Sequence, residues 1–375
     1  MKVLAAVMTA PHEPLVVTEV DLDEPRRDEV RVRVLASGIC RSDLSYIDGK
    51  WPIPCPIVLG HEGAGVVEAV GEGVDPGRVG EPVVLTFAPA CGRCRFCLEG
   101  RVNICSDSAA CADAGVLRDG TTRLRFRGER LHHLAFVSSF ATHAVCPSNA
   151  AIPVTAGVSA DLACLLGCGV TTGVLSVTRR ANVRPGDAVA IFACGGVGLS
   201  AVQGARLVSA DPVIAVDPLP EKRAMALALG ATHAVDPAAG DAAAQIRAIV
   251  PGGVDHAFEA IGNPEAAAQA FASVRDGGTT TLIGQPAIGV RASFPVYDVT
   301  QFEHTILGSN LGGAIPALHV PVLARLASAG KLDLERLVTH RLPLERINEA
   351  IALMASGTAG RVVITMDGED ERWNG

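Results

Sequence analysis

The chain has 375 residues, enough for two domains of ordinary size. Hydrophobic residues make up 49% of it and charged residues 19%, which is typical of a globular protein with large cores. A net charge of -8 without any basic block argues against nucleic acid as a partner. The longest apolar stretch, Leu162 to Val177, is shorter than the roughly 20 residues of a membrane span, so we expect a cytoplasmic protein with no membrane partner.

The first third of the chain has the pattern of β-strands. The opening run MKVLAAVM lacks a cleavage-type segment after it and is better interpreted as a strand than as a signal peptide. Residues 29–40 and 60–74 alternate apolar with polar or small residues, punctuated by glycines.

Four cysteines follow at close spacing, in the pattern C-x2-C-x2-C-x7-C: Cys91, Cys94, Cys97 and Cys105. Eleven cysteines in a chain without a secretion signal are expected to be thiols or metal ligands rather than disulfides. Four thiolates at this density favour a closed tetrahedral zinc site. An iron–sulfur cluster fits the same run, but nothing else in the sequence indicates electron transfer. A site with every position filled leaves none for substrate, so its predicted role is structural.

A second set of metal-binding residue types is scattered: Cys40 in GICRSD, His61 in GHEGAG and Cys168 in GCGVTTG. Two thiolates and an imidazole would leave a fourth zinc position open, as a catalytic site requires. Spacing alone does not find this set, and each residue taken singly could be an ordinary buried side chain.

From about residue 170, short apolar runs alternate with helix-like segments, which predicts a parallel sheet covered on both faces. The tail beyond about Leu311 carries amphipathic segments and a final strand, GRVVITM. Periodicity does not decide whether this tail extends the second domain or returns to the first.

A dinucleotide site is predicted at the first of these strand-to-helix turns. The strand AVAIFA leads into ACGGVG, with Gly195, Gly196, Val197 and Gly198 opening a helix. The glycines would let backbone N–H groups approach a pyrophosphate. Asp217 ends the next strand at the spacing of a ribose acceptor, which favours NAD over NADP. The first motif position is Ala193 instead of glycine.

Taken together, these motifs resemble a zinc-dependent medium-chain alcohol dehydrogenase of the long-lobed, liver-type branch, along essentially the whole chain. The resemblance implies an α/β fold, with a GroES-like catalytic domain at 1–169 that carries the zinc lobe at about 90–106. A Rossmann NAD-binding domain at 170–312 follows, and 313–375 returns to the catalytic domain. It also implies two zinc ions per chain, one structural and one catalytic, and a homodimer or homotetramer formed through the sheet edge near TILGSN.

The resemblance assigns roles residue by residue. Cys40, His61 and Cys168 would hold the catalytic zinc, Asp43 would orient His61, and Glu62 would lie behind the metal as a transient ligand. Ser42 would take the alcohol proton. Cofactor contacts are expected from Arg41, Lys222 and Arg361, and a substrate pocket is expected from Trp51, Phe87 and Leu134. The implied reaction is hydride transfer between a small primary or aromatic alcohol and NAD, giving an aldehyde, or the reverse.

Two departures from the family pattern bear on the reaction. Many relatives pass the proton on to a histidine where this chain has Ser45; a hydroxyl is no base at neutral pH, so we expect the relay to end in water. His132 and His133 are the alternative, although a paired histidine in a loop is more often structural. The glutathione-dependent formaldehyde branch has an acid where Trp51 stands and an arginine where Ala109 stands, which disfavours S-hydroxymethylglutathione as substrate.

Other functions stay open at this point. A formaldehyde dehydrogenase that uses a different thiol adduct is compatible with the sequence. A zinc-free quinone or enoyl reductase of the same superfamily usually lacks the cysteine lobe. A non-catalytic NAD- and zinc-binding scaffold protein would be expected to lose a ligand, whereas all three are present. Of the remaining cysteines, Cys194 lies in the cofactor turn, where alkylation would be expected to block NAD.

Overall fold

The computed structural model describes residues 1–154, 157–366 and 373. The chain forms two compact units, one of Met1–Cys168 with Ala314–Gly375 and one of Gly169–Gly313. These borders lie within one residue of the predicted domain boundaries, and the C-terminal segment is grouped with the first unit.

One part of the first unit is a closed barrel with the strand order β1-β2-β7-β8-β4. Its strands are β1 (Lys2–Met8), β2 (Val16–Leu22), β7 (Leu124–Phe126), β8 (Glu129–His133) and β4 (Ile57–Val58). Side chains such as Val7, Val20 and Leu131 are buried in one apolar core. The opening run is therefore a strand, because its apolar residues fill the barrel.

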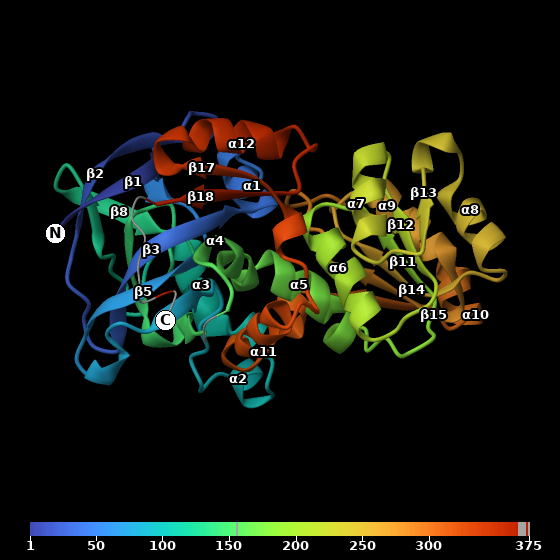
Figure 1. The fold of residues 1–375 in the computed structure, drawn as a ribbon, viewed down its shortest axis with the longest axis horizontal. Coiled ribbons are helices and arrows are strands. Elements are labelled where there is room, and N and C mark those ends of the chain that lie inside the picture. The colour runs from blue at the N-terminus through green and yellow to red at the C-terminus, as the bar shows by residue number, and fades with distance from the viewer. Residues whose placement is uncertain (155–156, 367–372, 374–375) are drawn as a thin grey trace. The chain divides into compact units, whose positions relative to one another are not determined.

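The larger sheet of this unit has the order β10-β6-β5-β3-β18-β17, and β9 also pairs with β3. Its strands are β3 (Glu29–Ile39), β5 (Glu62–Val70), β6 (Pro82–Leu85), β9 (His143–Pro147), β10 (Ala151–Pro153), β17 (Val338–Pro343) and β18 (Arg361–Thr365). Figure 1 shows the red C-terminal strand β18 beside the blue β3, with which it pairs antiparallel. The tail thus completes a sheet whose first strand in chain order is β3.

Helices of the first unit connect and cover these strands: α1 (Arg41–Ile47), α2 (Arg95–Leu98), α3 (Ser106–Ala114), α4 (Ala160–Ala163), α11 (Pro316–Ser328) and α12 (Ile347–Ala355). Helix α3 ends at Gly115, whose φ of 63° is readily adopted only by a residue without a Cβ. Helix α11 begins at Pro316, where a missing N–H costs no hydrogen bond.

The second unit has a parallel sheet in the order β13-β12-β11-β14-β15-β16, the order of the doubly wound dinucleotide-binding fold. The strands are β11 (Val189–Phe192), β12 (Val213–Val216), β13 (His233–Val235), β14 (Val254–Glu259), β15 (Val274–Leu282) and β16 (Thr305–Gly308). Every residue of β11 and β12 is buried, which fits a sheet covered on both faces.

The helices of this unit are α5 (Gly169–Leu175), which runs on as a π-helix over Ser176–Arg180, α6 (Gly196–Leu207), α7 (Pro220–Ala228), α8 (Ala242–Ile249), α9 (Pro264–Ser273) and α10 (Val296–Gln301). Helix α6 follows β11 directly after the glycine-rich turn. The sheet ends at β16, an edge strand whose residues are largely exposed.

Within the described part of the chain, no single helix combines the length and apolar composition of a membrane span. The segments Ala160–Gly167 and Gly169–Arg180 meet that test only when counted together across a bend.

Candidate active site and metal centres

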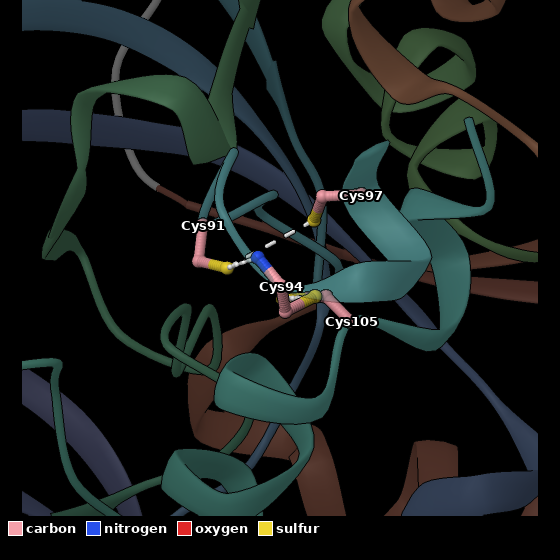
Figure 2. A group of neighbouring side chains, drawn as sticks. All are labelled: Cys91, Cys94, Cys97 and Cys105. Atoms are coloured by element: carbon pink, nitrogen blue, oxygen red, sulfur yellow. Dashed lines mark hydrogen bonds between the residues drawn. The ribbon is translucent and has the colours of Figure 1, made fainter. Parts of the chain in front are cut away.

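The cysteine lobe brings its four thiols together. Figure 2 shows Cys91, Cys94, Cys97 and Cys105 pointing toward one another around the short helix α2. The Sγ atoms of Cys91 and Cys97 lie 3.9 Å apart, and those of Cys94 and Cys105 lie 3.8 Å apart. Four sulfurs each about 2.3 Å from a tetrahedral zinc would be about 3.8 Å from one another. The donor set and its dimensions therefore fit zinc.

The lobe thiols differ in acidity. Hydrogen bonds, chiefly one from the backbone of Cys97, lower the pKa of Cys94 to about 6, whereas burial raises the pKa of Cys97 to about 12. Four neighbouring thiols cannot all ionise without a cation, because each thiolate repels the next. A divalent metal ion would remove this conflict and deprotonate all four.

A second group forms in the interior of the first unit. The ligand atoms of Cys40, His61, Glu62 and Cys168 all lie within 4.8 Å of one another, and all four residues are buried. Cys40 stands between β3 and α1. His61 directly precedes β5, Glu62 is its first residue, and Cys168 follows the 3-10 helix Cys164–Gly167. The fold thus unites the three scattered residues and adds a carboxylate to them.

Asp43 organises this group. Its Oδ2 accepts from the backbone N–H of Cys40 at 2.9 Å, while its Oδ1 accepts from that of Gly60 at 3.2 Å. The same Oδ1 lies 3.2 Å from Nδ1 of His61. A carboxylate there keeps a proton on Nδ1, so that Nε2 is the ring nitrogen available to a metal. This contact is the one that the resemblance assigns to Asp43.

Glu62 is paired on its far side with Arg361. The Arg361 guanidinium donates to Oε2 of Glu62, and both side chains are buried. Glu62 is on β5 and Arg361 on β18, the two strands that flank β3. The pair meets over Gly38 of β3, where any Cβ would overlap Glu62. Gly38 therefore makes the ion pair possible, a role that no sequence motif indicated.

The buried charges of this group are strongly coupled. The hydrogen bond between Cys40 and Cys168 lowers the pKa of Cys40 and raises that of Cys168, so Cys40 is the more acidic of the two thiols. Burial raises the pKa of Glu62 to about 7, although Arg361 opposes this. Thiol, imidazole and carboxylate donors held this close suit zinc, which would displace the protons of the thiols.

Two of the predicted substrate residues adjoin this part of the unit. The Phe87 ring meets the His61 ring edge-on, with centroids 5.6 Å apart. Trp51 packs edge-on against Tyr46 of α1 at 5.4 Å. Leu134 lies in the apolar core of the first unit and is 2% exposed. Its assignment to a substrate pocket stays a prediction, and this burial does not support it. Tyr46 was missed in the sequence, although it shares a helix with Ser42.

The proton-handling residues also have definite places. Ser42 Oγ lies 3.7 Å from Cys40 Sγ, beside the metal-binding group. Ser45 is buried and donates to the carbonyl of Arg41. His133 accepts from the backbone N–H of Arg123, and burial lowers its pKa to about 3, so it is neutral and structural. The side chain of His132 occupies the space that a Cβ at Gly115 would need.

The turn between β11 and α6 has the features of a pyrophosphate site. A Cβ at Gly198 would overlap the Ala193 carbonyl oxygen, so glycine is required there for helix and turn to pack. A Cβ at Gly195 would meet no protein atom within 4 Å, which leaves space for a ligand at the helix N-terminus. The motif residues Gly196 and Val197 form the first turn of α6.

Of the remaining predicted cofactor residues, Asp217 contacts the glycine-rich turn. Asp217, directly after β12, accepts from the backbone N–H of Cys194 in the turn at 2.8 Å. Lys222 is buried on α7; burial lowers its pKa, and the Asp217 charge opposes that shift. Arg41 is exposed in the first turn of α1. The contact of Arg361 with the pyrophosphate remains a prediction, since its observed partner is Glu62.

Two residues at this edge of the sheet need a different interpretation from the one the sequence suggested. Cys194 is fully buried, and burial raises its thiol pKa above the usual range, so the expected alkylation there is disfavoured. Glu259, at the end of β14, was not predicted. Its Oε1 accepts from the backbone N–H groups of three loop residues, Ile261, Gly262 and Asn263. An acid closing a strand was the signal available in the sequence.

Comparisons with known proteins agree along the whole chain. The model of the alcohol dehydrogenase GroES-like domain matches residues 26–156, and that of zinc-binding dehydrogenases matches residues 196–328. An S-(hydroxymethyl)glutathione dehydrogenase from Escherichia coli O1:K1 / APEC is 37% identical over 368 residues, 97% of this chain and 100% of the relative.

Solved structures give the same result. An alcohol dehydrogenase zinc-binding domain protein from Burkholderia ambifaria superposes with a TM-score of 0.94 at 40% identity, over 98% of this chain and 100% of that one. Benzyl alcohol dehydrogenase from Acinetobacter calcoaceticus gives a TM-score of 0.93 at 34% identity, with the same coverage. The predicted fold, a GroES-like domain with a Rossmann domain, is confirmed, and the predicted cofactors, zinc and a nicotinamide dinucleotide, are those of this class of dehydrogenases. The chain therefore belongs to the zinc-dependent alcohol dehydrogenases of the medium-chain superfamily and is an oxidoreductase acting on CH–OH groups.

Proposed function

We propose that this chain oxidises a primary or aromatic alcohol to the aldehyde, or runs the reverse reaction, with NAD as its redox partner. The observation that carries the proposal is the buried group of Cys40, His61, Glu62 and Cys168, with the Phe87 ring against His61. An aromatic wall next to a metal ligand suits an apolar or aromatic substrate better than a charged one.

In this proposal the protein residues hold and orient the reacting groups. Zinc, when bound by Cys40, His61 and Cys168, supplies a Lewis acid that lowers the pKa of a substrate hydroxyl toward neutrality. A bound NAD would supply the acceptor for the hydride of the alcohol carbon, so that an alcohol and NAD would give an aldehyde, NADH and one proton. Asp43 fixes the ring of His61 through the 3.2 Å contact at Nδ1.

Ser42 is the residue that we propose receives the proton, at Oγ. It lies beside Cys40, and its hydroxyl can accept one proton while it donates another. Ser45, which stands where many relatives have the relay histidine, is buried and donates to the Arg41 carbonyl. We therefore expect the proton to leave Ser42 to water and not through a second side chain.

A thiol adduct of formaldehyde is the rival substrate, because the matched E. coli relative is named for S-(hydroxymethyl)glutathione. Two features favour the simple alcohol. Trp51 is packed against the Tyr46 ring, and Ala109 is an exposed small residue on the lobe helix α3, so neither position offers a charge to a glutathione carboxylate. The benzyl alcohol dehydrogenase of Acinetobacter calcoaceticus is a structural relative at 34% identity.

An NAD reduction assay separates these substrates. We expect kcat/KM for benzyl alcohol to exceed that for S-(hydroxymethyl)glutathione by at least about tenfold, or about 1.4 kcal/mol of transition-state stabilisation. Phe87→Leu should raise KM for benzyl alcohol, whereas Phe96→Leu on the lobe helix α2 serves as the matched control. A preference for the thiol adduct, undiminished by Phe87→Leu, would exclude the aromatic alcohol.

We also propose a homo-oligomer formed through the edge of the parallel sheet, in an expected cytoplasmic location. Strand β16 is at the edge, and apolar residues on it, on helix α10 and directly after that helix are exposed: Ile306, Val296, Tyr297 and Phe302. Exposed apolar side chains along a free strand edge are typical of an interface between subunits. Ile306→Asp should convert a dimer or tetramer to a smaller species in light scattering; an unchanged mass would place the interface elsewhere.

A further inference from the structure

The dinucleotide turn contains a strained residue. Ala193, the first position of the glycine motif, has a φ of 72°. This left-handed region is readily adopted by glycine but disfavoured by a residue with a Cβ. An alanine remains there only when surrounding contacts fix it.

Two hydrogen bonds hold the backbone on either side of this strained φ angle. The Ala193 N–H donates to the carbonyl of Val216 at 2.8 Å, which anchors the residue to strand β12. One residue further on, the Cys194 N–H donates to Oδ2 of Asp217, also at 2.8 Å. Relaxation of Ala193 toward a negative φ would swing the Cys194 N–H away from Asp217. The carboxylate therefore opposes that relaxation.

The other contacts restrain the acid itself and the far side of the turn. Oδ1 of Asp217 accepts from the Leu219 N–H at 2.9 Å, so the carboxylate cannot rotate freely. The Ala193 carbonyl packs where Gly198 has no Cβ. Each carboxylate oxygen of Asp217 still has a second lone pair, which is the capacity needed for two ribose hydroxyls.

We propose that Asp217 is a positioning residue for the turn as well as the ribose acceptor, so that cofactor preference and turn conformation are coupled in this chain. The proposal rests on the NAD site described above. Replacing Asp217 to admit the 2′-phosphate of NADP would also release the strained Ala193 turn, and the pyrophosphate amides would lose their arrangement. Ala193→Gly removes the strain and makes the turn independent of Asp217.

A double-mutant cycle tests the coupling in the cofactor-free protein, with wild type, Ala193→Gly, Asp217→Ser and the double variant. Hydrogen exchange of the peptide covering residues 193–198 should be about tenfold faster in Asp217→Ser than in wild type, and this loss should shrink severalfold when Ala193 is glycine. Asp241→Ser is the matched control, since Asp241 caps α8 through two backbone N–H groups. It should leave exchange at residues 193–198 unchanged.

Cofactor titration then gives the functional result. Asp217→Ser should weaken NADH binding in both backgrounds, whereas NADPH should bind at least about tenfold more tightly to the double variant than to Asp217→Ser alone. Equal effects of Asp217→Ser in the alanine and glycine backgrounds, in exchange and in NADPH affinity, would overturn the proposal. Failure of the wild type to bind NADH would instead refute the NAD assignment and leave the exchange result intact.

Discussion

The two metal-binding groups of this chain differ in how they are built. The lobe takes its four thiols from residues 91–105, on a short helix and the turns next to it. The buried group takes Cys40, His61, Glu62 and Cys168 from the ends of strands and helices far apart in the sequence. One group is local and partly exposed, and the other is assembled by the tertiary fold and enclosed.

This difference separates structural from chemical roles. Four thiolates satisfy zinc completely, so the lobe can only stabilise. The buried group offers two thiols, an imidazole and a carboxylate that is paired with Arg361. Its donors are fixed by supporting contacts, above all those of Asp43. Four variants test whether the separation holds.

The largest effect is expected from removing a ligand of the buried group. Cys168→Ser should lower kcat/KM by about a thousandfold or more, because a lost Lewis acid removes several kcal/mol of transition-state stabilisation. Metal analysis should show one zinc lost per chain. Cys55→Ser, a partly buried thiol outside both groups, is the control and should keep both zinc ions. Full activity in Cys168→Ser would show that the buried group is not the reaction centre.

The next effect concerns the support of His61. Asp43→Asn should lower zinc affinity or kcat by about 10- to 100-fold, since an amide cannot serve all three of its present contacts as an acceptor. The measurements are turnover and the rate of zinc loss to a chelator. Asp48→Asn is the control, because Asp48 ends the same helix and pairs on the surface with Lys50. Equal behaviour of the two variants would reduce Asp43 to a helix-capping residue.

Removing a thiol of the lobe is expected to lower the stability of the protein and to leave its turnover nearly unchanged. Cys97→Ser should lower the melting temperature by on the order of 5–10 °C, because zinc binding energy is folding energy there. The kcat of the folded fraction should stay within about threefold of wild type. Cys111 lies on helix α3 but outside the four-thiol group, so Cys111→Ser should change neither the melting temperature nor kcat. A large loss of kcat with both zinc ions retained would give the lobe a part in the chemistry.

The smallest effect concerns His133, whose backbone N–H donates to the carbonyl of Gly115 at the end of helix α3. Burial lowers its pKa to about 3 in the folded chain, against an ordinary value of 6.5. Below pH 6.5 the unfolded chain therefore binds the proton first, and stability falls as the pH drops toward 3. Each pH unit in that window costs about 1.4 kcal/mol.

His133→Gln keeps an acceptor for the Arg123 N–H but has no titrating group. Between pH 7.5 and 5.5, its urea unfolding midpoint should fall less than that of the wild type. Comparing the two pH values within each protein cancels any constant effect of the substitution. Parallel midpoints would mean that His133 becomes protonated without unfolding.

Much of the molecule could be read from local patterns. The cysteine lobe, the glycine turn with Asp217 and the succession of strands and helices after residue 170 are short-range features, set by neighbouring residues and by helix and strand periodicity. The resemblance to a family then placed the tail, which no periodicity decided. Trp51 and Phe87 pack against other aromatic rings, whereas Leu134 lies in the core. The sequence could not separate these cases, because an apolar side chain alone does not indicate which surface it will face.

The sequence by itself determined the chemical inventory of this protein: four clustered thiolates, two more with a histidine, and an acid spaced from a glycine turn. Only the tertiary structure decided how these groups support one another. The Glu62–Arg361 pair forms because β5 and β18 flank β3, and because Gly38 between them has no side chain. Asp217 restrains Ala193 because β12 lies beside β11. Such contacts join residues that no local spacing relates, so they exist only once the sheets have formed.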